Sequence, residues 1–173
     1  GLGDVYKRQI DPCVFVDDDG QAFLYYGGGG KCQAAPLADN MTELAMPLVD
    51  QGGLPDFHEA AWVHKHNGMY YLSYADNHVE NGRGANRLHY AMAPTPMGPW
   101  EYKGVYLEPT GCDTSHGSIV KFKGQWYALY HNQDLSGRGN LRSICIDPLY
   151  YNEDGTIQPV KQHKNETIKV KKH

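Results

Sequence analysis

The chain has 173 residues, of which 40% are hydrophobic and 21% are charged. This length allows one ordinary domain with its own apolar core, and the composition excludes a disordered or collagen-like chain. The formal net charge of −4 gives no electrostatic reason to expect binding to DNA or RNA. No apolar run approaches the roughly 18 residues that a membrane-spanning helix needs, so we expect no membrane insertion.

The two ends of the chain differ from its middle. Residues 1–9 (GLGDVYKRQ) have no apolar period and resemble the translated end of a sequencing adaptor, so we interpret them as non-native. On that interpretation the native sequence enters at about Ile10, and earlier strands or an export signal would lie outside this chain. Residues 161–173 carry five Lys and one Glu, which predicts a basic, solvated tail.

A repeated strand-turn-strand unit organises the middle of the chain. Three segments align without gaps, namely residues 14–26 (VFVDDDGQAFLYY), 62–74 (WVHKHNGMYYLSY) and 118–130 (SIVKFKGQWYALY). Each predicts a β-hairpin, with a turn that ends at Gly20, Gly68 or Gly124. Further strands are expected at residues 87–93 and 100–106. A four-stranded unit that recurs at roughly 40 to 50 residues is typical of a β-propeller blade.

The number of residues limits how much of such a ring is present. About 160 residues at that period make roughly three blades, whereas a closed propeller has about four to eight. Helical periodicity is weak, and only residues 39–48 admit a helix. We therefore expect an all-β fold over residues 10–160, a partial β-propeller with about three blades that are each a four-stranded antiparallel sheet.

Three polar residues share one place in the repeat. Asp11, Glu59 and His116 each stand just ahead of the first strand of a hairpin. Equivalent positions in a radial array meet near its axis, and close carboxyl groups with a histidine can support acid-base chemistry. The alternative is that Asp11 begins a turn, Glu59 ends an exposed strand and His116 caps a loop. The threefold coincidence of register favours the functional interpretation.

Other apparent motifs do not match their templates. Residues 27–31 (GGGGK) lack the spacing of a phosphate-binding loop, and Trp62 stands where a zinc protease would have its second histidine. Residues 17–20 predict a hairpin turn rather than a calcium loop. His64 and His66 alternate along a strand next to a turn, so we expect them to be exposed and not to bind metal. The four cysteines lack the C-x-x-C spacing of a zinc or redox site.

The segments that carry these polar residues resemble glycoside hydrolase family 43. The matching segments are residues 10–12 (IDP) with the hairpin after them, residues 57–59 (FHE) followed by AAWVHKHNGMYYLSYA, and residues 116–118 (HGS) followed by IVKFKGQWYALYHN. Residues 91–100 and 141–160 also resemble that family, so the resemblance covers residues 10–160 in order and spacing. It implies a five-bladed β-propeller of inverting enzymes, commonly β-xylosidases and α-L-arabinofuranosidases.

The resemblance also implies roles for the three polar residues. Glu59 matches the general acid, which protonates the departing glycosidic oxygen. Asp11 matches the carboxylate that orients this acid and raises its pKa, since a glutamic acid with a pKa of about 4.3 is otherwise ionised at neutral pH. His116 matches a central histidine that is associated in some members with a bound Ca²⁺, which is the only cofactor that we expect.

Four further residues are expected to contact the substrate. Arg142 resembles the arginine that approaches the sugar, with a surface cation as the alternative. Phe57, His58 and Trp62 flank Glu59 and are expected to shape the sugar pocket. Strand packing is the alternative for the two aromatic rings.

Two departures from the family limit the expectation. Ala60 and Ala61 follow the acid where many members have Gly-Pro, which leaves the choice between xylose and arabinose open. The family's general base is an aspartate on the first blade, and upstream of Asp11 there is only Asp4, in the segment interpreted as non-native. We therefore expect the 173-residue chain alone to be inactive and poorly folded, because it lacks the base and leaves propeller edges unpaired.

The sequence thus predicts an inverting glycosidase that removes terminal xylose or arabinofuranose from a plant polysaccharide or oligosaccharide. A non-catalytic carbohydrate-binding propeller and a retaining glycosidase remain as alternatives. A polysaccharide substrate favours a secreted or periplasmic location.

Overall fold

The computed structural model describes residues 10–163. The segment interpreted as non-native and residues 164–173 of the predicted tail lie outside the described residues. Between residues 10 and 163 the chain forms strands and turns without any helix, and so without a helix that could cross a membrane. The all-β expectation is confirmed.

The first sheet is a meander of four antiparallel strands in sequence order. Its strands are β1 (Cys13–Val16), β2 (Ala22–Gly28), β3 (Lys31–Pro36) and β4 (Val49–Asp50). Residues 17–20 form the predicted turn between β1 and β2, in which the Gly20 amide donates to the Asp17 carbonyl. Gly29 and Gly30 join β2 to β3 with φ angles of 64° and 94°, a left-handed conformation that glycine adopts without steric cost.

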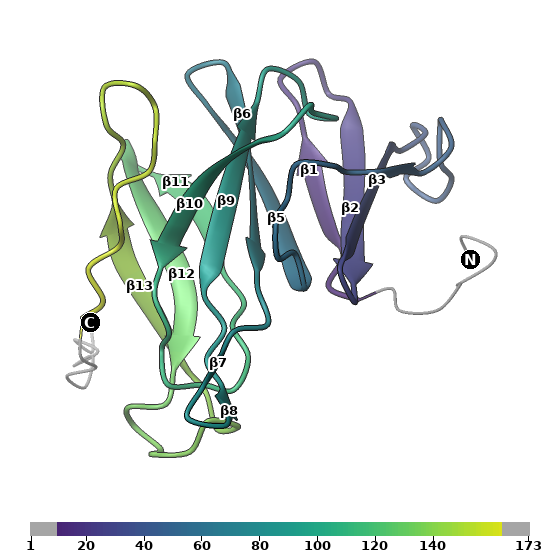
Figure 1. Ribbon diagram of the computed structural model, residues 1–173. Helices are drawn as coiled ribbons and strands as arrows, with labels where there is room; N and C mark the ends of the chain where they lie inside the picture. The colour runs from purple at the N-terminus through teal and green to yellow at the C-terminus, as the bar shows by residue number, and fades with distance from the viewer. Residues whose placement is uncertain (1–9, 164–173) are drawn as a thin grey trace, which may run out of the picture.

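The second sheet also has four antiparallel strands. These are β5 (Glu59–His66), β6 (Met69–Ala75), β9 (Leu88–Ala93) and β10 (Glu101–Leu107), in that spatial order. The connection between β6 and β9 carries a small hairpin of β7 (Val79–Glu80) and β8 (Arg83–Gly84). This hairpin extends beyond one end of the sheet, at the bottom of Figure 1.

The third sheet has three strands in the described part of the chain, rather than the four expected. They are β11 (Ser118–Phe122), β12 (Gln125–Asn132) and β13 (Ser143–Leu149). The chain that follows β13 turns back towards the second sheet, where the Val160 amide donates to the Tyr106 carbonyl over 2.8 Å. The side-chain amide of Gln162 then donates to the Glu108 carbonyl, so residues 161–163 are attached to the sheets rather than forming a free tail.

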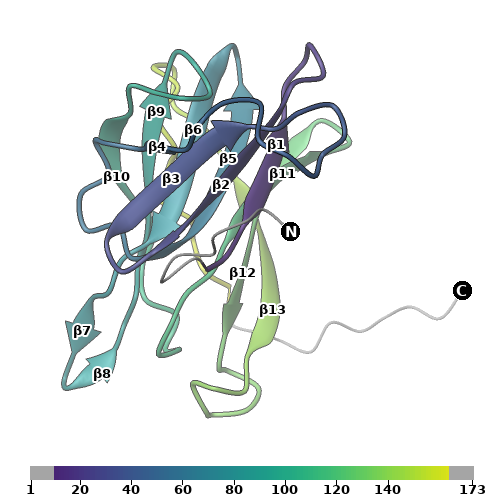
Figure 2. The ribbon, with the colours of Figure 1, turned by 90° about the vertical axis from the view of Figure 1, so that its right-hand side faces the viewer.

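The three sheets stand side by side like the blades of a fan (Figures 1 and 2). The first strands of the blades lie innermost, and β5 contacts β1 on one side and β11 on the other. One apolar core fills the space between the first and second sheets, and another fills the space between the second and third. This arrangement is the partial propeller that the repeat predicts.

Residues 39–48 do not form a helix. They make a loop of turns closed by an isolated antiparallel bridge between Leu37 and Leu44. Met41 has a φ of 61°, which no right-handed helix tolerates, and Asn40 accepts a hydrogen bond from the Thr42 amide. Local side-chain bonding therefore overrides the weak helical period.

His64 is buried, which corrects the expectation that it is exposed. Only 5% of its surface is accessible, because β5 is covered by sheets on both sides. Its ring stacks on Tyr71 with centroids 4.8 Å apart, and Nε2 shares a hydrogen bond of 2.8 Å with the Tyr151 hydroxyl. Burial, together with a smaller effect of the nearby His66, lowers the pKa of His64 to about 3.

This burial predicts acid sensitivity of the fold. In the unfolded chain His64 has a pKa of about 6.5, so between that pH and about 3 only the unfolded state gains a proton, and stability falls as the pH falls. The free energy of unfolding should therefore drop by about 2 kcal/mol between pH 6.5 and pH 5 through this residue alone. Urea denaturation of the complete protein and of its His64→Gln variant across this range measures the difference. Identical pH slopes in the two proteins would contradict the assignment.

Candidate active site

The three polar residues predicted from the repeat lie at the starts of the three innermost strands. Glu59 is the first residue of β5, while Asp11 and His116 stand two residues before β1 and β11. The antiparallel meanders place all three starts at the same end of the sheets as the β7–β8 hairpin (Figure 1). The register argument therefore brings an aspartate, a glutamate and a histidine to one end of the fold.

Asp11 and His116 come from the first and third blades and face each other. His116 Nδ1 lies 3.8 Å from Asp11 Oδ2, with the two side chains 47% and 25% exposed. Asp11 has a φ of 54°, an uncommon conformation for a residue other than glycine. The Ile10 carbonyl accepts a hydrogen bond from the Gly27 amide, which fixes the chain just before Asp11. Backbone strain held by neighbouring contacts is typical of functional sites.

Glu59 is directed by a β-bulge in β5. It pairs with Ala75, whereas Trp62 pairs with Ser73, so β5 has one more residue than β6 across this interval. Ala60 within the bulge has a φ of 62°. A bulge bends the strand and changes the direction of the side chains beside it. The Glu59 side chain is only 18% exposed, and its Oε2 lies 3.8 Å from Nε2 of His58.

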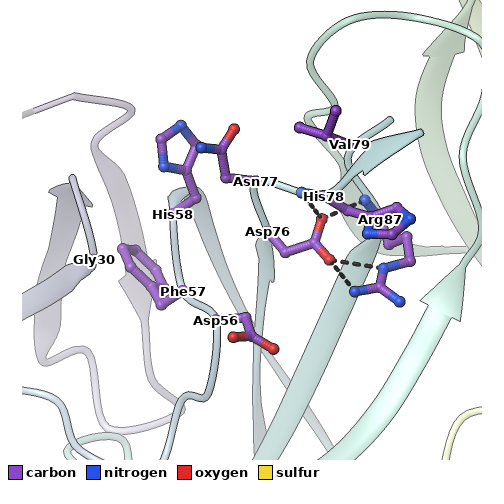
Figure 3. Close-up of a pocket in the computed structure, with 9 residues that line it drawn as sticks. All are labelled: Gly30, Asp56, Phe57, His58, Asp76, Asn77, His78, Val79 and Arg87. Carbon is purple, nitrogen blue, oxygen red and sulfur yellow. Dashed lines mark hydrogen bonds and ion pairs between the residues drawn. The ribbon is translucent and has the colours of Figure 1, made fainter. Parts of the chain in front are cut away.

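A pocket of about 500 Å³ opens at the same end of the second sheet, and Glu59 itself is not among the residues that line it (Figure 3). Its lining residues are Gly30, Asp56, Phe57, His58, Asp76, Asn77, His78, Val79 and Arg87. His58 is the link, since it lines the pocket and contacts Glu59. Figure 3 shows His58 and Asn77 among the polar side chains that line the pocket. The pocket therefore offers several hydrogen-bonding groups next to a carboxyl group, which suits a polyhydroxylated ligand.

One wall of the pocket is anchored by Asp76, which the sequence did not single out. Its carboxylate accepts hydrogen bonds from the Arg87 amide and Nε, both over 2.7 Å, and lies 2.9 Å from His89 Nε2. Burial raises the pKa of Asp76, but the hydrogen bonds from Arg87 and His89 outweigh it, and the pKa lies below its ordinary value. No motif spacing marks these residues, because they meet only when β6 and β9 pair.

Arg142 lies near His116 rather than in this pocket. Its Nη1 is 3.4 Å from Oγ1 of Thr114, in the loop that leads to His116, and 3.3 Å from Nε2 of His131 at the end of β12. Arg142 is thus an exposed residue whose guanidinium contacts Thr114 and His131. His131 was also missed by sequence reasoning, although it belongs to a segment that resembles the family.

The two aromatic residues beside Glu59 serve mainly in packing. The Trp62 indole Nε1 donates to the Ile119 carbonyl over 3.1 Å, which ties β5 to β11. Phe57 is 5% exposed and packs against Tyr74 with ring centroids 5.3 Å apart, although it also lines the pocket. The structure thus favours strand packing for Trp62, and both packing and a pocket wall for Phe57.

The groups around His116 do not by themselves make a calcium site. Calcium prefers roughly six to eight oxygen ligands, whereas the side-chain contact of His116 with an acid is the single long one to Asp11. In residues 10–163 no three His, Cys, Asp or Glu side chains are grouped to hold a metal ion. We therefore derive no catalytic step through a metal.

Comparisons with known proteins place the sequence and the fold in one family. The model of the family described as glycosyl hydrolases family 43 matches residues 2–157. A β-xylosidase of Xylanibacter ruminicola is 36% identical in an alignment of 193 positions, gaps included, that covers 88% of this chain. A family 43 β-xylosidase/α-arabinofuranosidase from a compost microbial metagenome, solved with xylotriose in a calcium-free form, superposes with a TM-score of 0.76 at 35% identity, over 87% of this chain and 57% of that one. A family 43 arabinoxylan arabinofuranohydrolase from Bacillus subtilis superposes with a TM-score of 0.81 at 30% identity, over 94% and 39%.

The chain spans 58% of the length of the Xylanibacter β-xylosidase. The matched parts of these relatives thus correspond to most of this chain, but this chain corresponds to between 39% and 58% of their lengths.

The Asp76 network predicts a large stability effect at a position away from the innermost strands. Asp76→Asn should lower the free energy of unfolding by about 1.5 to 3 kcal/mol, because the hydrogen bonds from Arg87 and His89 lose a charged acceptor. Urea denaturation measures the change. As a control, Asp50→Asn removes an exposed partner of Lys31 and should leave the midpoint nearly unchanged. A loss no larger for Asp76→Asn than for the control would contradict the proposed anchor.

Proposed function

Because the chain belongs to glycosyl hydrolases family 43, we propose that its protein hydrolyses the glycosidic bonds of terminal xylose or arabinofuranose residues in plant polysaccharides or oligosaccharides. The observation that carries this proposal is the meeting of Asp11, Glu59 and His116 at the same end of three neighbouring sheets. A pocket with hydrogen-bonding walls is lined by His58, the residue before Glu59, and supports the proposal because sugars bind through hydroxyl groups.

The proposed mechanism is inverting. Glu59, directed by the β5 bulge, donates a proton to the departing glycosidic oxygen, and Asp11 is the second carboxyl group that orients it. A further carboxylate, which the family resemblance assigns to the first blade, activates water on the opposite face of the sugar. In inverting enzymes these acid and base carboxyl groups stand roughly 6.5 to 9.5 Å apart, which leaves room for that water.

The proposed substrate class rests on the site and on the relatives together. Arg142 lies beside the His116 loop, where its guanidinium can donate to sugar hydroxyls. The relatives include proteins described as a β-xylosidase and as an arabinoxylan arabinofuranohydrolase, so both pentoses remain within the proposal. A polymeric plant substrate also favours a secreted or periplasmic enzyme.

The decisive experiment is hydrolysis of aryl β-xylosides and aryl α-L-arabinofuranosides followed by proton NMR. We expect the protein translated from the complete coding sequence to release pentose with inverted anomeric configuration, and the 173-residue chain alone to release none. Release of pentose with retained anomeric configuration would contradict the inverting mechanism and indicate a retaining one. If the complete protein binds xylo-oligosaccharides without hydrolysing them, it is a carbohydrate-binding propeller and not an enzyme.

The role of Glu59 predicts a dependence on the leaving group. Glu59→Gln in the complete protein should reduce kcat/KM by about 100-fold to 10,000-fold for xylobiose, whose leaving group needs a proton. The nitrophenolate of a nitrophenyl pentoside departs without full protonation, so the reduction in kcat/KM for these substrates should be much smaller. Steady-state kinetics with both substrates measures the ratio. Equal losses on both would count against Glu59 as the acid.

Glu43→Gln is the matched control for this substitution. Glu43 lies in the loop after β3, at the end of the sheets opposite to Glu59, and bonds to Asn40. Its replacement should leave both rates unchanged.

A further inference from the structure

The guanidinium of Arg142 is held between two segments of the third blade. Nη1 donates to Oγ1 of Thr114 over 3.4 Å and to Nε2 of His131 over 3.3 Å. Thr114 precedes His116 by two residues, and His131 stands opposite Ile144 in the β12–β13 pair. These two contacts use the Nη1 protons and leave those of Nε and Nη2, which the structure pairs with nothing in residues 10–163, to reach a ligand.

His131 is suited to accept from an arginine. An arginine has only donors, so Nε2 must carry a lone pair and the proton of the neutral ring must sit on Nδ1. Nδ1 is buried and has no hydrogen-bond partner in the part of the chain that the structure describes. Burial, together with smaller effects of Arg142 and His116, lowers the pKa of His131 to about 4, so the ring is neutral at neutral pH.

The loop between β12 and β13 also limits where Arg142 can go. The Ser136 hydroxyl lies 2.6 Å from the Leu141 carbonyl and accepts a hydrogen bond from the Arg138 amide over 3.0 Å. The Leu141 amide donates to the Arg138 carbonyl. These bonds fix the backbone just before Arg142, so its long side chain remains the mobile part and needs a partner to hold its head group.

We propose that His131 is a positioning residue that accepts a hydrogen bond from Arg142 Nη1 and so aims the remaining guanidinium protons at the sugar hydroxyls of the substrate. This inference rests on the proposed function, because it assumes that Arg142 contacts the sugar. His131 itself touches no substrate and acts only through Arg142. A structural histidine that merely fills space between the strands would not be coupled to Arg142.

A double-mutant cycle on xylotriose affinity separates these roles. In the complete protein, His131→Phe keeps a ring of similar size without the acceptor and should weaken binding about tenfold, as measured by calorimetric titration. Arg142→Ala should weaken binding at least as much, and the double variant should lose no more than Arg142→Ala alone. His131→Gln restores an acceptor at the reach of Nε2 and should recover most of the affinity.

His66→Phe is the matched control, since His66 lies in the aromatic cluster at the opposite end of β5 and should leave the affinity unchanged. Additive losses in the double variant would overturn the proposal. So would equal losses in His131→Phe and His131→Gln, because both would then report packing.

A ligand-free measurement distinguishes failure of this inference from failure of the proposed function. Nitrogen-15 relaxation of Arg142 Nε should report an ordered side chain in the wild type and in His131→Gln, and a mobile one in His131→Phe. Equal mobility in all three would overturn the positioning role whatever the protein does to sugars. An ordered Arg142 in a protein that binds no pentoside would instead refute the proposed function, and with it the sugar-directed role.

Discussion

The packing of β5 between its two neighbours is the interaction on which the rest of the structure depends. Each blade is a single sheet that cannot cover its own faces, so it needs the neighbouring blades to bury its apolar side chains. β5 meets β1 on one side and β11 on the other, and the Trp62 indole adds a hydrogen bond to the Ile119 carbonyl. This packing sets the spacing between the innermost strands and therefore the spacing between the polar residues at their starts.

The same burial explains the polar groups inside the fold. A buried charge is tolerated only with partners, and Asp76 has both Arg87 and His89. Asp17, in the turn between β1 and β2, is a second carboxylate with partners, and these come from the neighbouring blade. Burial raises its pKa, yet hydrogen bonds from Lys65 and Tyr70 outweigh this and bring the pKa below its ordinary value. The ion pair of Asp17 with Lys65 joins the first blade to the second, whereas the ion pairs of Asp76 join β6 to β9 within the second blade.

Much of this arrangement could be predicted from the sequence, for physical reasons. Hairpins depend on local turn chemistry and strand alternation, so all three appear where the glycines at the turns place them. Contacts that depend on which strands pair, such as that of Asp76 with Arg87, carry no local signal. The burial of His64 was not predicted for a related reason. Alternation of residues along a strand indicates an exposed side chain only where one face of the sheet is open to solvent, and β5 is covered on both faces.

The site itself is divided among blades, and this division links stability to function. Asp11, Glu59 and His116 each belong to a different sheet, and Asp11 and His116 meet across the gap between the first and third. Neither the bulge that directs Glu59 nor the contacts of Arg142 can compensate for a shift of one whole sheet against another. Because inter-sheet packing, with the few hydrogen bonds and ion pairs between blades, holds these three residues in register, loosening the cores beside β5 would separate them before any single blade unfolds.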